Sequence, residues 1–420
     1  MFSFRPKKKK NRSLLYKISA WLHLWLGLIS GIVVFIVSIT GAIYTFKDEI
    51  QLLVEPFQTV EVPEEQATFL PPSELKDAVQ DEYGYPSVWS VHYRGEGKSA
   101  VIPYYADPSN YQVGFVNPYT AEPLHNRHLD GDFFRFILIG HYQLWLPRSI
   151  GKPIVAYGTL MFVILLISGL VLWWPKRWSG RNLKKSLTMS WKSTWRRINY
   201  DLHNVVGFYT LLVALILALT GMVYGMSWFK DAVYWTASGG QQPDTERVTS
   251  DTTLVAHNNP QEDEDILFNN LLQSGVDPAE NQINIRYPRD EEGVWNVQVN
   301  PNLQNRYLSR STYYEQHSLR QLKKEKAFSE VNGGEQLSRL NYDLHVGSIG
   351  GIWTKIIAFI ACLVSASLPV TGFIFWWDRE KRQQKLREMK AAKSNKKKSN
   401  LKVEELEVQE PKPKKPEKVG

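Results

Sequence analysis

Four long apolar stretches constrain this chain more than any other feature. They cover about residues 21–46, 153–174, 204–228 and 351–377, and charged residues are almost absent from each. A helix needs about 20 apolar residues to span about 30 Å of hydrocarbon, so each stretch is long enough to cross a bilayer. A buried helix of a soluble protein rarely runs so long. The sequence therefore predicts an α-helical membrane protein with four transmembrane helices in a lipid bilayer.

Basic segments next to these stretches predict the orientation. Lys and Arg are concentrated in RPKKKKNR at 5–12, in the connection 175–200 and in DREKRQQKLREMK at 378–390. By the positive-inside rule these segments face the cytoplasm, and the long connections 47–152 and 229–350 face outward. The net charge of +8 then reflects membrane flanks, and no motif accompanies it that would indicate nucleic-acid binding. The single Cys362 excludes an intrachain disulfide and a cysteine-based cluster.

The apolar stretches repeat along the chain. LHLWLGLISGIVVFIVSITGAIY (22–44) aligns without a gap with LHNVVGFYTLLVALILALTGMVY (202–224), and ISGLVLWWPKR (167–177) aligns with VTGFIFWWDRE (370–380). The matched residues are His23 with His203, Gly27 with Gly207, Gly41 with Gly221, and Gly169 with Gly372. This pattern predicts a parallel internal duplication, in which each copy is a helix, an outer domain and a second helix.

Each outer connection predicts a small α+β module. The first reads as a helix at 71–83 followed by strands near 86–93, 99–105 and 111–117. The second reads as a helix from 262 followed by strands near 282–287, 293–299 and 309–315.

The expected segments of the chain are a basic N-terminus 1–17, helix one 18–46, module one 47–140, helix two with an outer lead-in 141–174, a basic loop 175–200, helix three 201–228, module two 229–344, helix four 345–377, and a Lys-, Glu- and Pro-rich tail 378–420 predicted to be disordered.

Four histidines lie at the ends of the predicted helices. His23 and His203 are expected near the cytoplasmic face, and His141 and His345 near the outer face. Ionisable residues at membrane depth are costly and tend to be functional. Two neutral imidazoles that face each other across a bundle suit axial ligation of a haem iron. The histidines thus predict two stacked b-type haems with these four ligands, bound non-covalently because no CxxCH motif occurs.

Small residues accompany the histidines. Gly27 and Gly207 each follow a histidine by four residues, on the same helix face, where a flat macrocycle could approach the backbone. Gly41 and Gly221 lie at the far ends of their helices, roughly 26 Å along the axis, at the depth of the other haem. Gly169 and Gly372 are expected to do the converse. We therefore assign these six glycines to the haem sites.

Two plainer interpretations stay open. Histidines at an interface often only satisfy headgroups or backbone carbonyls, and spaced small residues often only permit tight helix packing.

The path of His141 is indirect, because LPRSIGKP separates it from the apolar stretch that begins at Pro153. An amphipathic segment at the outer surface, or an early start to helix two, has to carry His141 inward.

The motifs resemble a known family. LHLWLGL…TG, GHYQLWL…SGLVLWWPKR, YDLHNVVG…TG and NYDLHVGSIGG…LPVTGFIFWWDR look like the four helices of PepSY-associated transmembrane proteins. VNPYTAEPL and STYYEQHSL look like closing strands of PepSY modules, although Asn117 and Ala121 stand where the family usually has an acidic residue and Gly. The resemblance implies an iron-regulated protein of the bacterial inner membrane, similar to di-haem ferric-siderophore reductases, with the four histidines as ligands.

The resulting interpretation is an electron conduit, an oxidoreductase that moves electrons from an inner donor to an outer acceptor such as a ferric siderophore. No nucleotide-binding loop is seen, so a quinol or a separate reductase has to be the donor. One alternative is a haem-free PepSY-type sensor or interaction protein that binds peptides or proteases. A transporter built on parallel repeats ranks last, since the apolar stretches show neither breaks nor buried charges.

Overall fold

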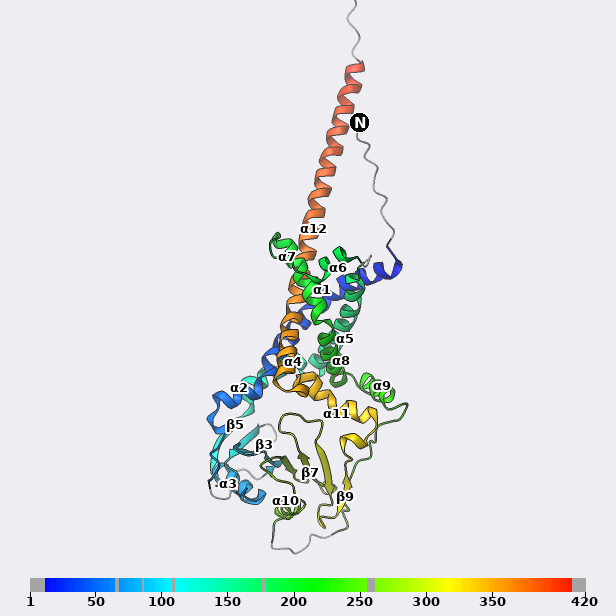
Figure 1. The fold of residues 1–420 in the computed structure, drawn as a ribbon. Coiled ribbons are helices and arrows are strands. Elements are labelled where there is room, and N and C mark those ends of the chain that lie inside the picture. The colour runs from blue at the N-terminus through cyan, green and yellow to red at the C-terminus, as the bar shows by residue number, and fades with distance from the viewer. Residues whose placement is uncertain are drawn as a thin grey trace, which may run out of the picture.

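The structure is a computed structural model that describes residues 12–64, 68–84, 87–107, 110–175, 179–254 and 261–409. A bundle of long helices carries a β-sheet domain at one end (Figure 1). We call this end of the bundle the sheet end. The opposite end holds the start of the first helix and the connection 179–200, which are rich in Lys and Arg, and we call it the basic end.

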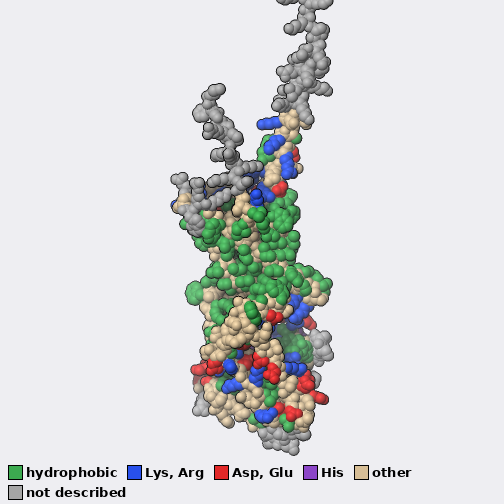
Figure 2. Space-filling view, turned by 90° about the vertical axis from the view of Figure 1, so that its right-hand side faces the viewer, with side chains coloured by type: hydrophobic (Ala, Val, Ile, Leu, Met, Phe, Trp, Pro, Cys, Tyr) green, Lys and Arg blue, Asp and Glu red, His purple; other side chains and the backbone are tan. Residues whose placement is uncertain are grey.

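Four membrane-spanning helices form the bundle. They are α1 (Leu14–Thr45), α5 (Arg148–Trp173), the continuous helix made of α7 (Trp195–Asp201), η3 (Leu202–Val206) and α8 (Gly207–Gly225), and α12 (Ile352–Gln409). All four are long and apolar enough to cross a membrane, which confirms the predicted transmembrane helices. Figure 2 shows apolar side chains covering this part of the surface, as lipid contact requires.

Shorter helices surround both ends of the bundle. At the basic end lies α6 (Gly180–Leu187). The sheet end carries α2 (Lys47–Val54), α4 (Phe133–Gln143), α9 (Ser227–Ala237), α11 (Gly333–Val346) and the short turns η1 (Pro56–Gln58), η2 (Leu129–Gly131), η4 (Phe328–Glu330) and η5 (Ser348–Gly350). Two of these, α4 and α11, matter most for function, because each ends next to a predicted site histidine.

The sheet domain is one antiparallel sheet. Its strands follow the order β5-β4-β3-β2-β6-β7-β8-β9, and β1 pairs with β3. They are β1 (Ser87–Val88), β2 (Ser90–Tyr93), β3 (Ala100–Asp107), β4 (Asn110–Val116), β5 (Pro123–His128), β6 (Gln282–Arg286), β7 (Trp295–Asn300), β8 (Arg310–Tyr314) and β9 (Gln321–Lys324). The expected strands are confirmed, and β5 and β9 extend each set by one strand that the sequence analysis missed.

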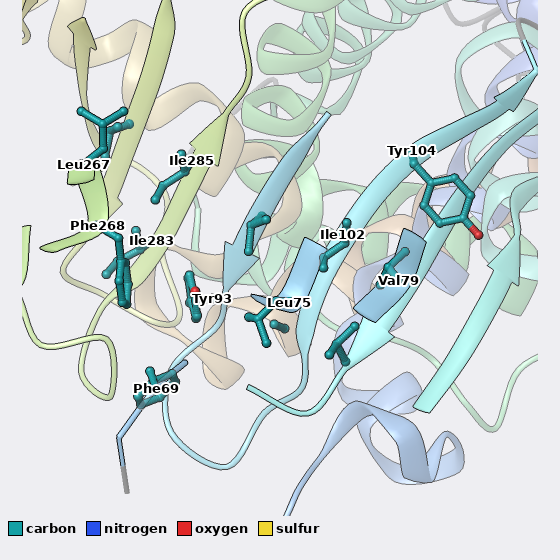
Figure 3. Packing of buried hydrophobic residues seen from close by; sticks show 14 of the residues in the cluster. Phe69, Leu75, Val79, Tyr93, Ile102, Tyr104, Leu267, Phe268, Ile283 and Ile285 are labelled. Atoms are coloured by element: carbon teal, nitrogen blue, oxygen red, sulfur yellow. The ribbon is translucent and has the colours of Figure 1, made fainter. Parts of the chain in front are cut away.

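Two helices cover one face of the sheet. These are α3 (Pro72–Tyr83) and α10 (Asp263–Gln273), each contributed by a different half of the chain. The core between helices and sheet is shown in Figure 3; its buried members include Leu75, Val79, Tyr93, Ile102, Leu267, Phe268, Ile283 and Ile285. Residues alternate between the two faces of a strand, so the neighbours of the strand residues in this core point to the opposite face of the sheet.

The two α+β modules are joined into one sheet, whereas the sequence predicts them as separate units. The junction is the antiparallel pair β2–β6, in which Ser90 lies opposite Arg286 and Tyr93 lies opposite Ile283. Each module alone would leave one of these strands as an open edge with unpaired backbone groups, and the pairing removes both edges. A single hydrophobic core then spans both halves.

The chain after Trp377 also differs from expectation. The tail 378–420 is predicted to be disordered, but α12 continues to Gln409. Residues 381–409 contain neither Gly nor Pro and are rich in Lys, Glu, Gln and Arg, which favour helix. The high charge of this segment predicts disorder, but its helix-favouring residues form a continuous helix. Residues 410–420 lie outside the described part of the chain.

His92 on β2 makes the sheet domain sensitive to acid. Its side chain points away from the core, and burial together with Arg94, Arg306 and Arg286 lowers its pKa to about 3. The His92 imidazole therefore takes up a proton near pH 6.5 in the unfolded chain but only near pH 3 in the folded protein. Stability should fall as the pH drops through this window.

Between pH 7 and pH 4 we expect the free energy of unfolding of the parent to fall by about 2–4 kcal/mol more than that of His92→Gln. Urea unfolding of both purified proteins at the two pH values measures this difference.

Candidate functional site

The four predicted histidines form two facing pairs. His23 on α1 faces His203 in η3, with ring centroids 6.1 Å apart and ring planes at 89°. His141 on α4 faces His345 on α11, with centroids 6.0 Å apart and planes at 57°. We call these the basic-side pair and the sheet-side pair. Segments more than a hundred residues apart in the sequence thus bring each pair together.

Local structure positions each histidine differently. His203 lies in the π turn η3, a local widening of the helix that often marks a functional position. His141 and His345 lie near the C-termini of α4 and α11, which are separate from the membrane-spanning helices α5 and α12. Leu144 and Trp145 then adopt positive φ, which ends α4 and turns the chain into α5. An amphipathic segment therefore carries His141 to the bundle, one of the two routes that the sequence left open.

In the basic-side pair, a neighbouring helix binds each imidazole through its Nδ1 atom. His23 Nδ1 lies 3.1 Å from the Leu165 carbonyl oxygen and 3.1 Å from Ser168 Oγ. His203 Nδ1 lies 3.0 Å from Thr371 Oγ1. The hydroxyl of Thr371 donates its own proton to the Ser367 carbonyl at 2.9 Å, so toward histidine it acts as an acceptor.

The sheet-side pair repeats this arrangement. His141 Nδ1 lies 2.9 Å from the Val37 carbonyl oxygen and 3.3 Å from Thr40 Oγ1. His345 Nδ1 lies 3.1 Å from the Leu217 carbonyl oxygen and 3.0 Å from Thr220 Oγ1. A carbonyl oxygen can only accept, so Nδ1 carries the proton and Nε2 keeps a free lone pair. All four imidazoles are held in the tautomer that a metal ligand needs.

Four of the predicted glycines form seats for these rings. A Cβ atom built on Gly169 would lie 3.2 Å from Cε1 of His23, and one on Gly372 would lie 3.1 Å from Cε1 of His203. The corresponding distances are 3.0 Å from Gly41 to His141 and 3.2 Å from Gly221 to His345. The Ser/Thr-Gly motif therefore works as a unit, since the hydroxyl binds Nδ1 and the glycine leaves room for the ring.

Gly27 and Gly207 have different neighbours. A Cβ atom on Gly27 would lie 3.7 Å from a methyl group of Leu165, and one on Gly207 would lie 3.2 Å from a methyl group of Leu368. Leu165 and Leu368 each lie three residues before the Ser or Thr that binds a basic-side histidine. These two glycines thus bring α1 and α8 close to the helices that hold the histidines.

The ring separations match one metal ion held between two imidazoles. A metal–imidazole bond is about 2.0 Å and the ring centroid lies about 1.1 Å further, so imidazoles on opposite sides of one iron have centroids about 6.2 Å apart. The pairs show 6.1 and 6.0 Å. Within the described residues, no group of three or more His, Cys, Asp or Glu side chains is placed to hold a metal ion. A metal between these rings therefore needs further donors from its own ligand, as a macrocycle provides.

A cavity of about 760 Å³ adjoins the sheet-side pair. This volume is within the range of about 300–1,000 Å³ that is typical of small-molecule sites. Its deep part lies inside the bundle and is apolar, with Val33, Val37, Phe162, Ala214 and Leu217 in its wall. His141, His345 and their glycine seats line the same cavity. A flat apolar group between the two rings would have this wall around it.

One motif of the site was not predicted from the sequence. The pentapeptide NYDLH occurs at 199–203 and again at 341–345, and both copies end in a site histidine. Asn199 donates to the Thr371 carbonyl at 3.0 Å, and Asn341 donates to the Thr220 carbonyl at 3.3 Å, so each asparagine binds the threonine that contacts the histidine of its own motif. A search for identical short words would have found it. The alignment of the repeats matches His203 with His23, so it does not place the two copies of NYDLH together.

The aspartates of this motif anchor each histidine segment to a neighbouring loop. Asp201 is fully buried and accepts from the backbone N–H of Ser190 at 3.0 Å and from the guanidinium of Arg197. Asp343 is also fully buried and accepts from the backbone N–H groups of Arg306 and Tyr307 at 2.9 and 2.8 Å. Buried carboxylates with several donors hold a backbone firmly.

Comparison with known proteins gives the family. No curated protein matches the chain. A family described as the PepSY-associated TM region matches residues 20–379. This range holds all four site histidines, both NYDLH motifs and the whole sheet. The chain therefore belongs to the family of the PepSY-associated TM region.

Proposed function

We propose that the two histidine pairs each bind one b-type haem and that the protein carries electrons across the membrane. The observation that carries this proposal is the fourfold repetition of one arrangement: each Nδ1 is bound to a neighbouring helix, each ring lies against a glycine, and the rings of each pair have centroids about 6 Å apart. Satisfaction of headgroups or simple helix packing would not require the same tautomer and ring separation at both ends of the bundle.

The protein's own contribution is to hold the four imidazoles in position and to give them an apolar surrounding. When bound, haem supplies one-electron Fe(III)/Fe(II) chemistry. The Ser, Thr and carbonyl partners of Nδ1 orient the rings and raise the basicity of Nε2. The apolar wall that includes Val33, Val37 and Leu217 surrounds the deep part of the cavity at the sheet-side pair. Thus no residue has to act as an acid, base or nucleophile.

The same proposal includes a topology. We infer a bacterial inner-membrane location, with the basic end and both termini in the cytoplasm and the sheet domain in the periplasm. Exposed cations at the basic end, among them Lys184, Lys185 and Arg196, support this orientation. A parallel duplication with two PepSY-like modules is supported by the same order of helix and antiparallel strands in each half.

Electrons would enter at the basic-side pair and leave at the sheet-side pair. The donor in this proposal is a quinol or a separate reductase. The acceptor is a ferric siderophore, whose Fe(III) takes up one electron and leaves as Fe(II). The cavity beside the sheet-side pair supports an acceptor at this end, because it continues from the histidines to the underside of the sheet.

The test is a haem count on the full chain. Purified in detergent after expression with sufficient haem, the protein should contain about two b haems per chain by the pyridine haemochrome assay. Its reduced-minus-oxidised spectrum should be that of low-spin, six-coordinate haem. A protein without haem under these conditions would refute the proposal and favour a haem-free PepSY-type sensor that binds peptides or proteases.

A further inference from the structure

The cavity at the sheet-side pair has a second, polar part. From the histidines toward the sheet it continues between the bundle and the sheet, where α5, α11 and the loop after β7 form its walls. Five cationic side chains line this part, and one acidic side chain, Asp48, lies among them. The cations are Lys47, Arg148, Lys152, Arg306 and Lys355. A low-dielectric wall behind charges of one sign concentrates their field in the cavity.

Three of these cations have no carboxylate partner. Lys355 binds Glu49 at 2.7 Å, and Lys47 lies 3.8 Å from Asp48. Within the described residues, no carboxylate lies within 4.0 Å of the charged groups of Arg148, Lys152 or Arg306. Arg148 and Lys152 are four residues apart in α5, which places them on the same helix face.

Arg306 is tied to the segment that carries His345. Its backbone N–H donates to Asp343, two residues before the histidine, at 2.9 Å. Its guanidinium lies over the ring of Tyr342, 4.1 Å from the centroid. Arg306 thus contacts Tyr342 and Asp343, which precede His345 on α11, while its side chain is exposed and lines the cavity. An anion bound by this guanidinium would lie next to the sheet-side pair.

We propose that the polar part of the cavity is the binding site for the electron acceptor and that it selects ferric chelates of net negative charge. This inference rests on the proposed function for the identity of the acceptor. A b-type haem at the sheet-side pair brings two propionates. Arg148, Lys152 and Arg306 carry three positive charges, and two propionates carry two negative charges. At least one positive charge therefore remains for an acceptor.

Three tyrosines complete the site. Tyr44, Tyr224 and Tyr342 line the cavity, and the ring of Tyr224 lies edge-on to His345 with centroids 5.7 Å apart. Phenol hydroxyls donate hydrogen bonds to anionic oxygen atoms. Arg306 together with these hydroxyls suits the catecholate, carboxylate or hydroxycarboxylate oxygens that give a ferric chelate its negative charge.

The test measures binding with a metal that is not reduced. Full-length protein in nanodiscs is titrated calorimetrically, at low salt, with the trianionic tris-catecholate complex of gallium(III) and with a monocationic gallium(III) trihydroxamate. We expect the anion to bind about 10-fold more tightly or better, and added salt to weaken it. Arg306→Gln should weaken anion binding about 3- to 10-fold and leave the cation unaffected or slightly favoured.

Arg310→Gln is the matched control, because Arg310 is exposed on β8 and does not line the cavity. It should bind both complexes as the parent does. The inference is overturned if the parent binds both complexes equally, if Arg306→Gln weakens both equally, or if it lowers haem content while anion binding is unchanged. The titration needs no electron transfer, so a parent that lacks haem but binds the anion would refute the proposed function alone.

Discussion

Replacing His345 with alanine is expected to lower the haem content from about two to about one per chain, and His23→Ala is expected to do the same at the other pair. Each change removes one Nε2 and leaves a single imidazole opposite an empty space. A double variant that lacks one histidine of each pair should contain almost no haem. Pyridine haemochrome analysis of the purified variants gives the ratio directly.

His128→Ala is the control for this experiment. His128 is exposed on β5 and does not line the cavity beside the sheet-side pair, so the variant should keep both haems. Far-UV circular dichroism checks that helix content is unchanged in every variant. If His23→Ala and His345→Ala retained the full haem content, the four histidines would not be the ligands, and the assignment of both sites would be wrong.

The second large effect is expected at a glycine. A Cβ atom on Gly41 would lie 3.0 Å from Cε1 and 3.3 Å from Nδ1 of His141, closer than most Cβ atoms approach any neighbour. Gly41→Val therefore has to displace the imidazole from its hydrogen bond with Val37. We expect the haem of the sheet-side pair to be lost, with a stability cost of about 1–3 kcal/mol, as overpacking usually brings.

Gly27→Ala tests whether a glycine of the site acts by leaving room for a histidine ring or by contacting the macrocycle. Its added methyl group would lie 3.7 Å from a methyl group of Leu165, an ordinary van der Waals distance, so both haems should remain. Loss of haem from Gly27→Ala would mean that Gly27 lies against the haem itself. Retention of both haems in Gly41→Val would contradict the seat that the structure gives to His141.

Much of the protein could be predicted from the sequence because the signals are local. Helix length and apolarity depend on consecutive residues, and the four transmembrane helices followed directly from them. The four histidines and the glycines were found because the two halves repeat the same words in the same order. Strand alternation in VWNVQV identified β7 in the same way.

Other features depend on contacts between distant segments. The pairing of β2 with β6 joins edges that lie almost two hundred residues apart, and no local pattern in either strand requires it. The route of His141 depends on how α4 packs against α1. The long C-terminal helix is a different case, because its helix propensity is local but its high charge also suits a disordered segment. The NYDLH motif was readable, but its meaning came only from the asparagine contacts to Thr371 and Thr220.

The sequence by itself determined that the chain crosses a membrane four times and carries four histidines in repeated positions. The tertiary structure alone decided which ring nitrogen is held and which cations share a cavity with the sheet-side pair. The physical reason is the range of the interactions. Hydrophobic spans are a property of neighbouring residues, whereas a ligand pair and a charged cavity exist only after separate helices have packed together.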